Sequence, residues 1–158
     1  NICNEPKYSD ILHLPHGLEG YFDFDEGVIC AIQKNKPLFV DFTGHSCANC
    51  KEMEQKVWSD PRVLEKLKND FIIVSLYVDE RQKLPENEYF ESKNGKIIKT
   101  VGQKSVNFQL EKFSSNATPL YAIFDHNGNS LVEPKGHDLN IENFLKFLDE
   151  GKQKFESK

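Results

Sequence analysis

Asp41-Phe42-Thr43-Gly44-His45-Ser46-Cys47-Ala48-Asn49-Cys50-Lys51 is the stretch of sequence that decides the fold of this chain. An apolar run at residues 37–40 comes before it and is typical of a buried strand. After it, Met53 and Val57 fall on one face of a helical pattern. Two cysteines three positions apart therefore lie where a strand passes into a helix, and cysteines at this spacing can form a disulfide or bind a metal ion.

The composition indicates one globular domain and argues against two classes of function. The chain has 158 residues, 38% of them hydrophobic, which is enough for a proper core. Its net charge is −5 and its basic residues are spread among acidic ones, so no basic patch for nucleic acid is visible. No apolar run reaches the length of about eighteen residues that predicts a membrane span. We expect a monomer that does not insert into a membrane.

The start of the sequence leads to a further expectation. The first residue is Asn1 rather than methionine, and no charged head followed by an apolar segment is present. We therefore expect a mature or excised fragment, whose upstream sequence carried a signal or a membrane anchor.

The pattern along the chain predicts an α/β architecture, with a central mixed sheet and helices on both faces. Residues 1–19 are broken by Pro6, Pro15 and Gly17 and are expected to form an irregular N-terminal extension, followed by one domain over residues 20–158. Residues 80–102 are expected to be a surface insertion, with a hairpin turning at Asn94-Gly95. The predicted strands are 21–22, 38–43, 71–78, 119–124 and 131–132, and the predicted helices cover about 25–34, 47–58, 62–68, 106–113 and 141–153.

The cysteine pair at the start of a helix predicts thiol–disulfide exchange. The free N–H groups and the positive end of the helix dipole stabilise a thiolate on Cys47, which would be the exposed nucleophile. Cys50, one turn deeper, would resolve the mixed disulfide that Cys47 forms with a partner. Asp41 is costly to bury in a central strand unless it is used or paired, and it could accept the proton of Cys50 directly or through water.

Other interpretations of the cysteines remain open at this point. Cys47 and Cys50 with His45 could bind copper or zinc, although a structural zinc site needs four ligands and no second pair follows. A purely structural disulfide would close too small a loop to constrain much. Cys30 is most simply a buried small hydrophobe, and the sequence does not say whether Cys3 pairs with anything.

Three motifs resemble the thioredoxin fold: residues 39–42, residues 47–51 and Thr118-Pro119 before a strand. The resemblance implies a three-layer fold in which Pro119 is a cis proline packed against the disulfide. It also implies that Thr118 offers backbone hydrogen bonds to a bound partner peptide. The family needs no cofactor beyond its disulfide, so we expect no cofactor and no metal. The sequence departs from thioredoxin at His45 and Ser46, which would contact the partner, with His45 able to act on Cys47 as a nearby cation.

A closer resemblance covers residues 21–147 and is carried by residues 41–44, 51–54 and 57–63. These residues are similar to the C-terminal periplasmic domain of the DsbD family of transmembrane thiol:disulfide interchange proteins. The resemblance implies a periplasmic protein-disulfide reductase that receives electrons from a membrane-embedded domain and passes them to partner proteins. Two alternatives are a free-standing thioredoxin-like reductase for cytochrome c maturation and a copper-binding chaperone.

Overall fold

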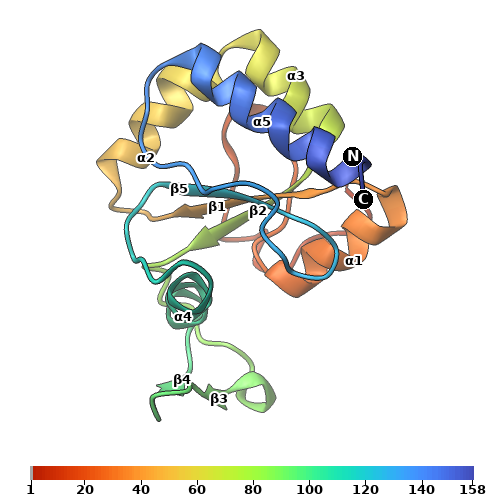
Figure 1. Ribbon diagram of the computed structural model, residues 1–158. Coiled ribbons are helices and arrows are strands. Elements are labelled where there is room, and N and C mark those ends of the chain that lie inside the picture. The colour runs from red at the N-terminus through yellow and green to blue at the C-terminus, as the bar shows by residue number, and fades with distance from the viewer. Residues whose placement is uncertain (1) are drawn as a thin grey trace.

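Three strands form the central sheet of the computed structural model, which describes residues 2–158 (Figure 1). Strand β1 (Leu38–Thr43) lies in the middle, with β2 (Ile72–Tyr77) parallel to it on one side and β5 (Leu120–Phe124) antiparallel on the other. Every residue of β1 is buried, which agrees with its apolar character on both faces. The register places Asp41 between Ser75 of β2 and Tyr121 of β5.

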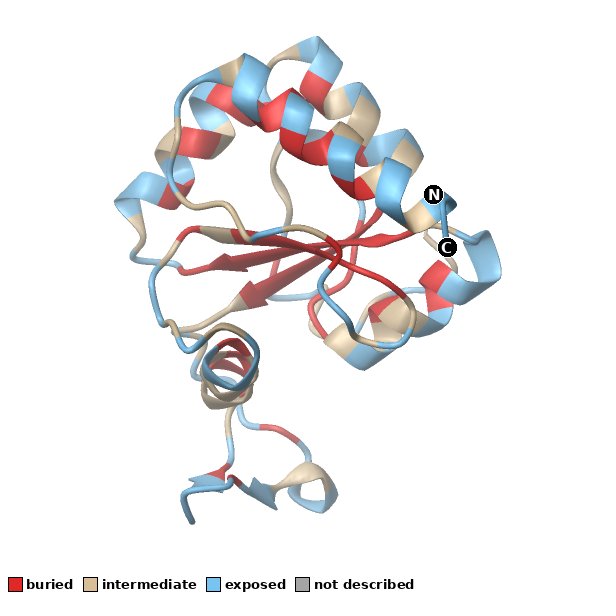
Figure 2. Cartoon of the chain, viewed as in Figure 1, coloured by how far each residue is buried: buried red, intermediate tan, exposed pale blue. Residues whose placement is uncertain are grey.

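Helices cover both faces of this sheet, as predicted (Figure 1). Because side chains alternate along a strand, Phe39 and Asp41 point to one face while Leu38, Val40 and Phe42 point to the other. The first face packs against α2 (Ala48–Met53), the π-helical turn η2 (Glu54–Trp58), α3 (Pro61–Asp70) and α5 (Ile141–Glu156). The second face packs against α1 (Phe24–Lys34) and α4 (Val101–Phe113). Figure 2 shows the burial concentrated in the sheet and in the helix faces turned toward it.

Aromatic side chains fill the core beneath α3 and α5. Phe39 is fully buried and contacts four other rings, at centroid distances of 5.6 to 6.2 Å. These rings belong to Trp58, Phe71, Tyr121 and Phe144. This cluster fixes the sheet against the helix that carries the cysteines.

The insertion predicted at residues 80–102 is present and extends away from the sheet below α4 (Figure 1). Its two short strands, β3 (Phe90–Glu91) and β4 (Ile97–Ile98), pair antiparallel around a turn with Gly95 at φ 84°, which confirms the predicted hairpin. A 3-10 turn, η3 (Glu86–Glu88), precedes them. Hydrogen bonds join both sides of its base, from Leu84 N–H to the Lys99 carbonyl and from Val101 N–H to the Gln82 carbonyl, each 2.9 Å long.

Several predicted boundaries were wrong for identifiable reasons. Helix α4 begins at Val101 rather than at residue 106, because Thr100 and Gln103 form a capping box at its start. The helix after Cys47 changes to a π-helical turn at Glu54, although it ends at Trp58 as predicted. The strands predicted at residues 21–22 and 131–132 are reduced to isolated bridges, Tyr21 with Val74 and Ser130 with Phe124.

The interpretation of Cys30 as a lone buried hydrophobe was also wrong. Cys30 is 1% exposed, as expected, but it forms a disulfide with Cys3 across a sequence separation of 27. This bond attaches the start of the N-terminal extension to α1. Within residues 2–19, the one helical element is the 3-10 turn η1 (Pro15–Gly17), and Leu12 is buried in the domain.

Within the part of the chain that the structure describes, no helix combines the length and the apolar character needed to cross a membrane.

Candidate active site

Cys47 and Cys50 form a disulfide at the N-terminus of α2, with their Cα atoms 5.3 Å apart. Cys47 is the N-cap residue of this helix, and its Sγ accepts a hydrogen bond of 3.1 Å from the Cys50 N–H. Cys50 is 1% exposed, whereas Cys47 is partly exposed and its neighbours Ala48 and Asn49 face solvent. Of the two sulfurs, that of Cys47 is therefore the one that another protein can reach. The roles of Cys47 as nucleophile and Cys50 as resolving cysteine stay predictions.

Asp41 lies on the face of the sheet that α2 covers and is 2% exposed. Its carboxylate accepts a hydrogen bond of 3.2 Å from the Ser75 hydroxyl. Burial, together with the negative charge of Glu54, raises the pKa of Asp41 to about 8, against the opposing effect of the Ser75 hydrogen bond. A carboxyl group with this pKa can both accept and release a proton near neutral pH. The transfer of a proton from Cys50 to Asp41 stays a prediction.

Glu54 is a second acidic residue near the pair that the sequence analysis did not single out. It is partly buried, and this burial raises its pKa, while the charges of His16 and Lys51 oppose the rise. Spacing could have identified it, because Glu54 follows Cys50 by four positions and so lies on the same helical face. It acts on the site by raising the pKa of Asp41.

The turn that leads to Cys47 contains two of the predicted partner-contacting residues, His45 and Ser46. Both residues donate their backbone N–H groups to the carboxylate of Asp79, at 2.8 and 3.0 Å. The His45 ring lies against the Tyr77 ring, with 4.6 Å between centroids, and its Nε2 is 2.8 Å from Glu80 Oε1. His45 is thus anchored to the residues that follow β2, and its predicted effect on Cys47 and contact with a partner stay predictions.

Thr118 and Pro119 lie at the same end of the sheet as the cysteines. Leu120 pairs with Phe42, so Pro119 is next to the end of β1, from which the chain continues into residues 44–47. The Thr118–Pro119 peptide bond is cis, as the resemblance to thioredoxins implied. The side-chain amide of the fully buried Gln109 donates a hydrogen bond of 2.7 Å to the Ala117 carbonyl, which anchors this loop to α4.

The metal-binding alternative depended on a third ligand beside the cysteines. His45, the candidate for that ligand, has its Nε2 engaged with Glu80. Among residues 2–158, no group of three or more His, Cys, Asp or Glu side chains is arranged to hold a metal ion.

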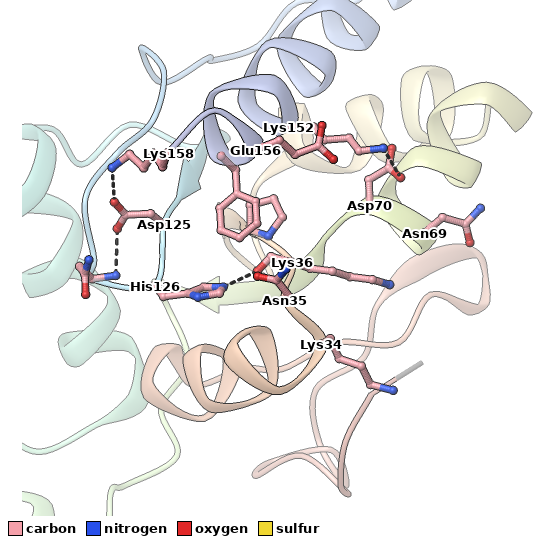
Figure 3. A pocket seen from close by; sticks show the side chains of 13 residues that line it. Lys34, Asn35, Lys36, Asn69, Asp70, Asp125, His126, Lys152, Glu156 and Lys158 are labelled. Carbon is pink, nitrogen blue, oxygen red and sulfur yellow. Dashed lines mark hydrogen bonds and ion pairs between the residues drawn. The ribbon is translucent and has the colours of Figure 1, made fainter.

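A large hollow of the surface, of about 580 Å³, lies at the opposite end of the sheet (Figure 3). It is lined by Pro37 before β1 and by Asp125 after β5. Four of its charged side chains form ion pairs, Lys152 with Asp70 at 3.3 Å and Lys158 with Asp125 at 2.6 Å. The described residues that line it include no cysteine, so the chemistry of the cysteine pair belongs to the other end.

Comparisons with known proteins agree with this fold. Residues 24–152 match the family model described as Thioredoxin-like domain. The thiol:disulfide interchange protein DsbD of Campylobacter jejuni, in strains RM1221 and NCTC 11168, is 34% identical over 151 residues, which is 94% of this chain and 22% of the relative. The chain thus spans about a fifth of the length of these curated relatives.

Three solved structures illustrate the similarity in fold. A DsbH oxidoreductase has a TM-score of 0.63 at 14% identity, covering 90% of this chain and 91% of that one. A thioredoxin from Thermus thermophilus has a TM-score of 0.57 at 22% identity, with coverages of 82% and 84%. The oxidised C-terminal domain of DsbD from Neisseria meningitidis has a TM-score of 0.55 at 16% identity, with coverages of 84% and 99%. At these identities the likeness shows the fold.

Proposed function

Because this chain belongs to the thioredoxin-like domain family, we propose that it is a thiol:disulfide oxidoreductase that reduces disulfides of partner proteins through Cys47 and Cys50. The observation that carries this proposal is the Cys47–Cys50 disulfide at a helix N-terminus, with the buried carboxyl group of Asp41 on the covered sheet face. The similarity to interchange proteins over 94% of this chain supports the same reaction.

The reaction transfers two electrons from the reduced cysteine pair to the partner. The Cys47 thiolate attacks one sulfur of the partner disulfide, and the other partner sulfur leaves as a thiolate that takes up a proton. The Cys50 thiol then gives its proton to ionised Asp41 and attacks the Cys47 sulfur. This step closes the Cys47–Cys50 disulfide and releases the second partner thiol. A donor dithiol must then reduce the pair again before the next cycle.

The compartment that fits this chemistry is the periplasm, with a membrane-embedded domain as electron donor. The name of the relatives, thiol:disulfide interchange protein DsbD, and their much greater length support a module within a larger electron-transfer protein. The second disulfide, Cys3–Cys30, supports an oxidising compartment, because such bonds are rare in the cytosol of mesophiles.

The two single cysteine variants test this function. Reduced wild-type protein is expected to reduce insulin disulfides, Cys47→Ser to be inactive, and Cys50→Ser to accumulate a mixed disulfide that mass spectrometry detects. The double variant Cys3→Ser/Cys30→Ser is the control and is expected to keep full activity, because that pair packs in the core on the other face of the sheet, away from Cys47. Activity that persists in Cys47→Ser would contradict the proposal.

A further inference from the structure

We infer that Asp79 is a positioning residue for Cys47 and that it makes the base of the insertion at residues 80–102 part of the active site. This inference rests on the proposed function, because a nucleophile needs positioning only if it exchanges with a partner. It assigns a role to a segment in which the sequence showed no chemistry.

The contacts of Asp79 hold the backbone immediately before the nucleophile. Its Oδ1 accepts the His45 N–H at 2.8 Å, and its Oδ2 accepts the Ser46 N–H at 3.0 Å. On the inner side of the same turn, the Cys47 N–H donates to the Gly44 carbonyl at 3.3 Å. One carboxylate therefore fixes two consecutive peptide groups, and the residue that follows them is Cys47.

The turn and the carboxylate fit closely. A Cβ atom at Gly44 would lie 3.1 Å from Asp79 Oδ2 and 3.3 Å from its Cγ. A contact this short leaves little room for a side chain at position 44. The backbone of the turn thus lies closer to Asp79 than a residue with a Cβ atom could without a small shift of the carboxylate.

Glu80 extends the same connection into the insertion. Its Oε1 meets the His45 ring at 2.8 Å, while its Oε2 accepts the Gln82 N–H at 2.7 Å. Its carbonyl accepts the Gly102 N–H at 2.9 Å, which joins the two ends of the insertion. The insertion and the turn before Cys47 are therefore held together through Asp79 and Glu80.

Asp125 provides a matched control for the experiment. Its Oδ1 also accepts two backbone N–H groups, from Asn127 and Asn129, each at 2.9 Å. It follows β5 at the end of the sheet remote from Cys47. At Asp79 the change to asparagine replaces one of the two accepting oxygens by an NH2 group, so one of the two N–H contacts is lost. At Asp125 one oxygen accepts both N–H groups, so asparagine can keep them and loses the carboxylate charge and its ion pair with Lys158. Asp125→Asn therefore controls for the loss of a carboxylate charge and for a general loss of stability.

The test compares Asp79→Asn with Asp125→Asn in two reactions of the reduced protein. The first is alkylation of Cys47 by iodoacetamide at a pH high enough to ionise the thiol fully, and the second is reduction of insulin disulfides. Alkylation needs only an exposed thiolate, whereas exchange needs three sulfur atoms aligned in a docked complex. We expect Asp79→Asn to slow exchange on the order of tenfold at an unchanged alkylation rate, because misplaced reacting groups lose rates of this size or more. Asp125→Asn is expected to leave both rates unchanged.

Equal exchange rates in Asp79→Asn and wild type would overturn the inference, and so would a loss of alkylation in parallel with exchange. Hydrogen exchange of the wild-type protein gives a test that does not depend on the variant folding. The His45 and Ser46 amides are expected to be protected although both residues lie at the surface, and unprotected amides would refute their hydrogen bonds to Asp79. If wild type itself does not reduce insulin, the proposed function fails; if wild type is active and Asp79→Asn equals it, only the inference fails.

Discussion

Replacement of Asp41 by asparagine should stabilise the folded protein, and by an amount that depends on pH. Burial and the charge of Glu54 raise the pKa of Asp41 to about 8 in the folded protein, whereas an exposed aspartate in the unfolded chain has a pKa of about 3.9. Because the folded pKa is the higher one, the folded state holds a proton between these values that the unfolded state has released. The free energy of unfolding therefore falls as pH rises through this window.

The magnitude follows from the two pKa values. Each pH unit between them costs the wild type about 1.4 kcal/mol, so the cost is about 4 kcal/mol at pH 7 and between about 1 and 2 kcal/mol at pH 5. An asparagine side chain at this position would carry no charge at any pH and could still hydrogen-bond to Ser75. We expect Asp41→Asn to be more stable than wild type by up to about 4 kcal/mol at pH 7, with about 3 kcal/mol of this gain lost at pH 5.

Urea denaturation of both proteins in the oxidised form, at pH 5, 6 and 7, measures this difference without interference from cysteine ionisation. Asp125→Asn is the control, because this substitution should change stability in the opposite direction and destabilise the folded protein. Burial raises the pKa of Asp125, but its hydrogen bonds with Lys158, Asn129 and Asn127 lower the pKa by more, so the net shift is downward. The ionised carboxylate therefore stabilises the fold at pH values above its unfolded pKa, and this stabilisation is lost as pH falls. A stability difference between Asp41→Asn and wild type that is absent at pH 7, or constant from pH 5 to 7, would refute the reasoning.

Three other predictions concern the surroundings of the site and the core. Glu54→Gln removes a charge that raises the pKa of Asp41, so the Asp41 carboxyl should titrate below about 8 by NMR, and an unchanged titration would show that burial alone sets its pKa. Cys3→Ser/Cys30→Ser opens a loop with a sequence separation of 27. In urea denaturation, this variant should have a free energy of unfolding lower than that of wild type by about 3 to 4 kcal/mol. A loss below about 1 kcal/mol would mean that the bond does not restrict the unfolded chain. Phe39→Ala removes the ring at the centre of the aromatic cluster and should lower the free energy of unfolding by about 3 to 5 kcal/mol. The control is Ile32→Ala, which changes a side chain that is 56% exposed and should lower the free energy of unfolding by less than about 0.5 kcal/mol. Equal losses in the two variants would contradict the packing described.

Local sequence patterns were enough to predict several elements, including the strand that leads to the cysteine pair. Strand β1 has the bounds predicted for it, and α3 begins within one residue of its predicted start, because Asp60 caps the helix and Pro61 takes its first position. The insertion hairpin followed from Asn94-Gly95, because a turn that needs a positive φ at glycine has a strong local signal. In each case, the information lies within a few residues of sequence.

The parts that could not be predicted depend on contacts between distant residues. Asp79 and Glu80 have no local signal of a role, since their partners His45 and Ser46 lie more than thirty positions earlier. The Cys3–Cys30 bond joins an irregular segment to a helix, and nothing in either segment specifies the pairing. The pKa of Asp41 also needed the structure, because its rise depends on complete burial and on the position of Glu54.

The reduction potential of the Cys47–Cys50 couple tests the central claim most directly. It can be measured by equilibrating the protein with dithiothreitol or glutathione buffers and quantifying the Cys47–Cys50 disulfide by mass spectrometry, with Cys3 and Cys30 replaced by serine. A protein that reduces its partners should have a potential close to that of thioredoxin, about −270 mV. A potential near that of the oxidant DsbA, about −120 mV, would contradict the account, because the pair would then withdraw electrons from partner thiols.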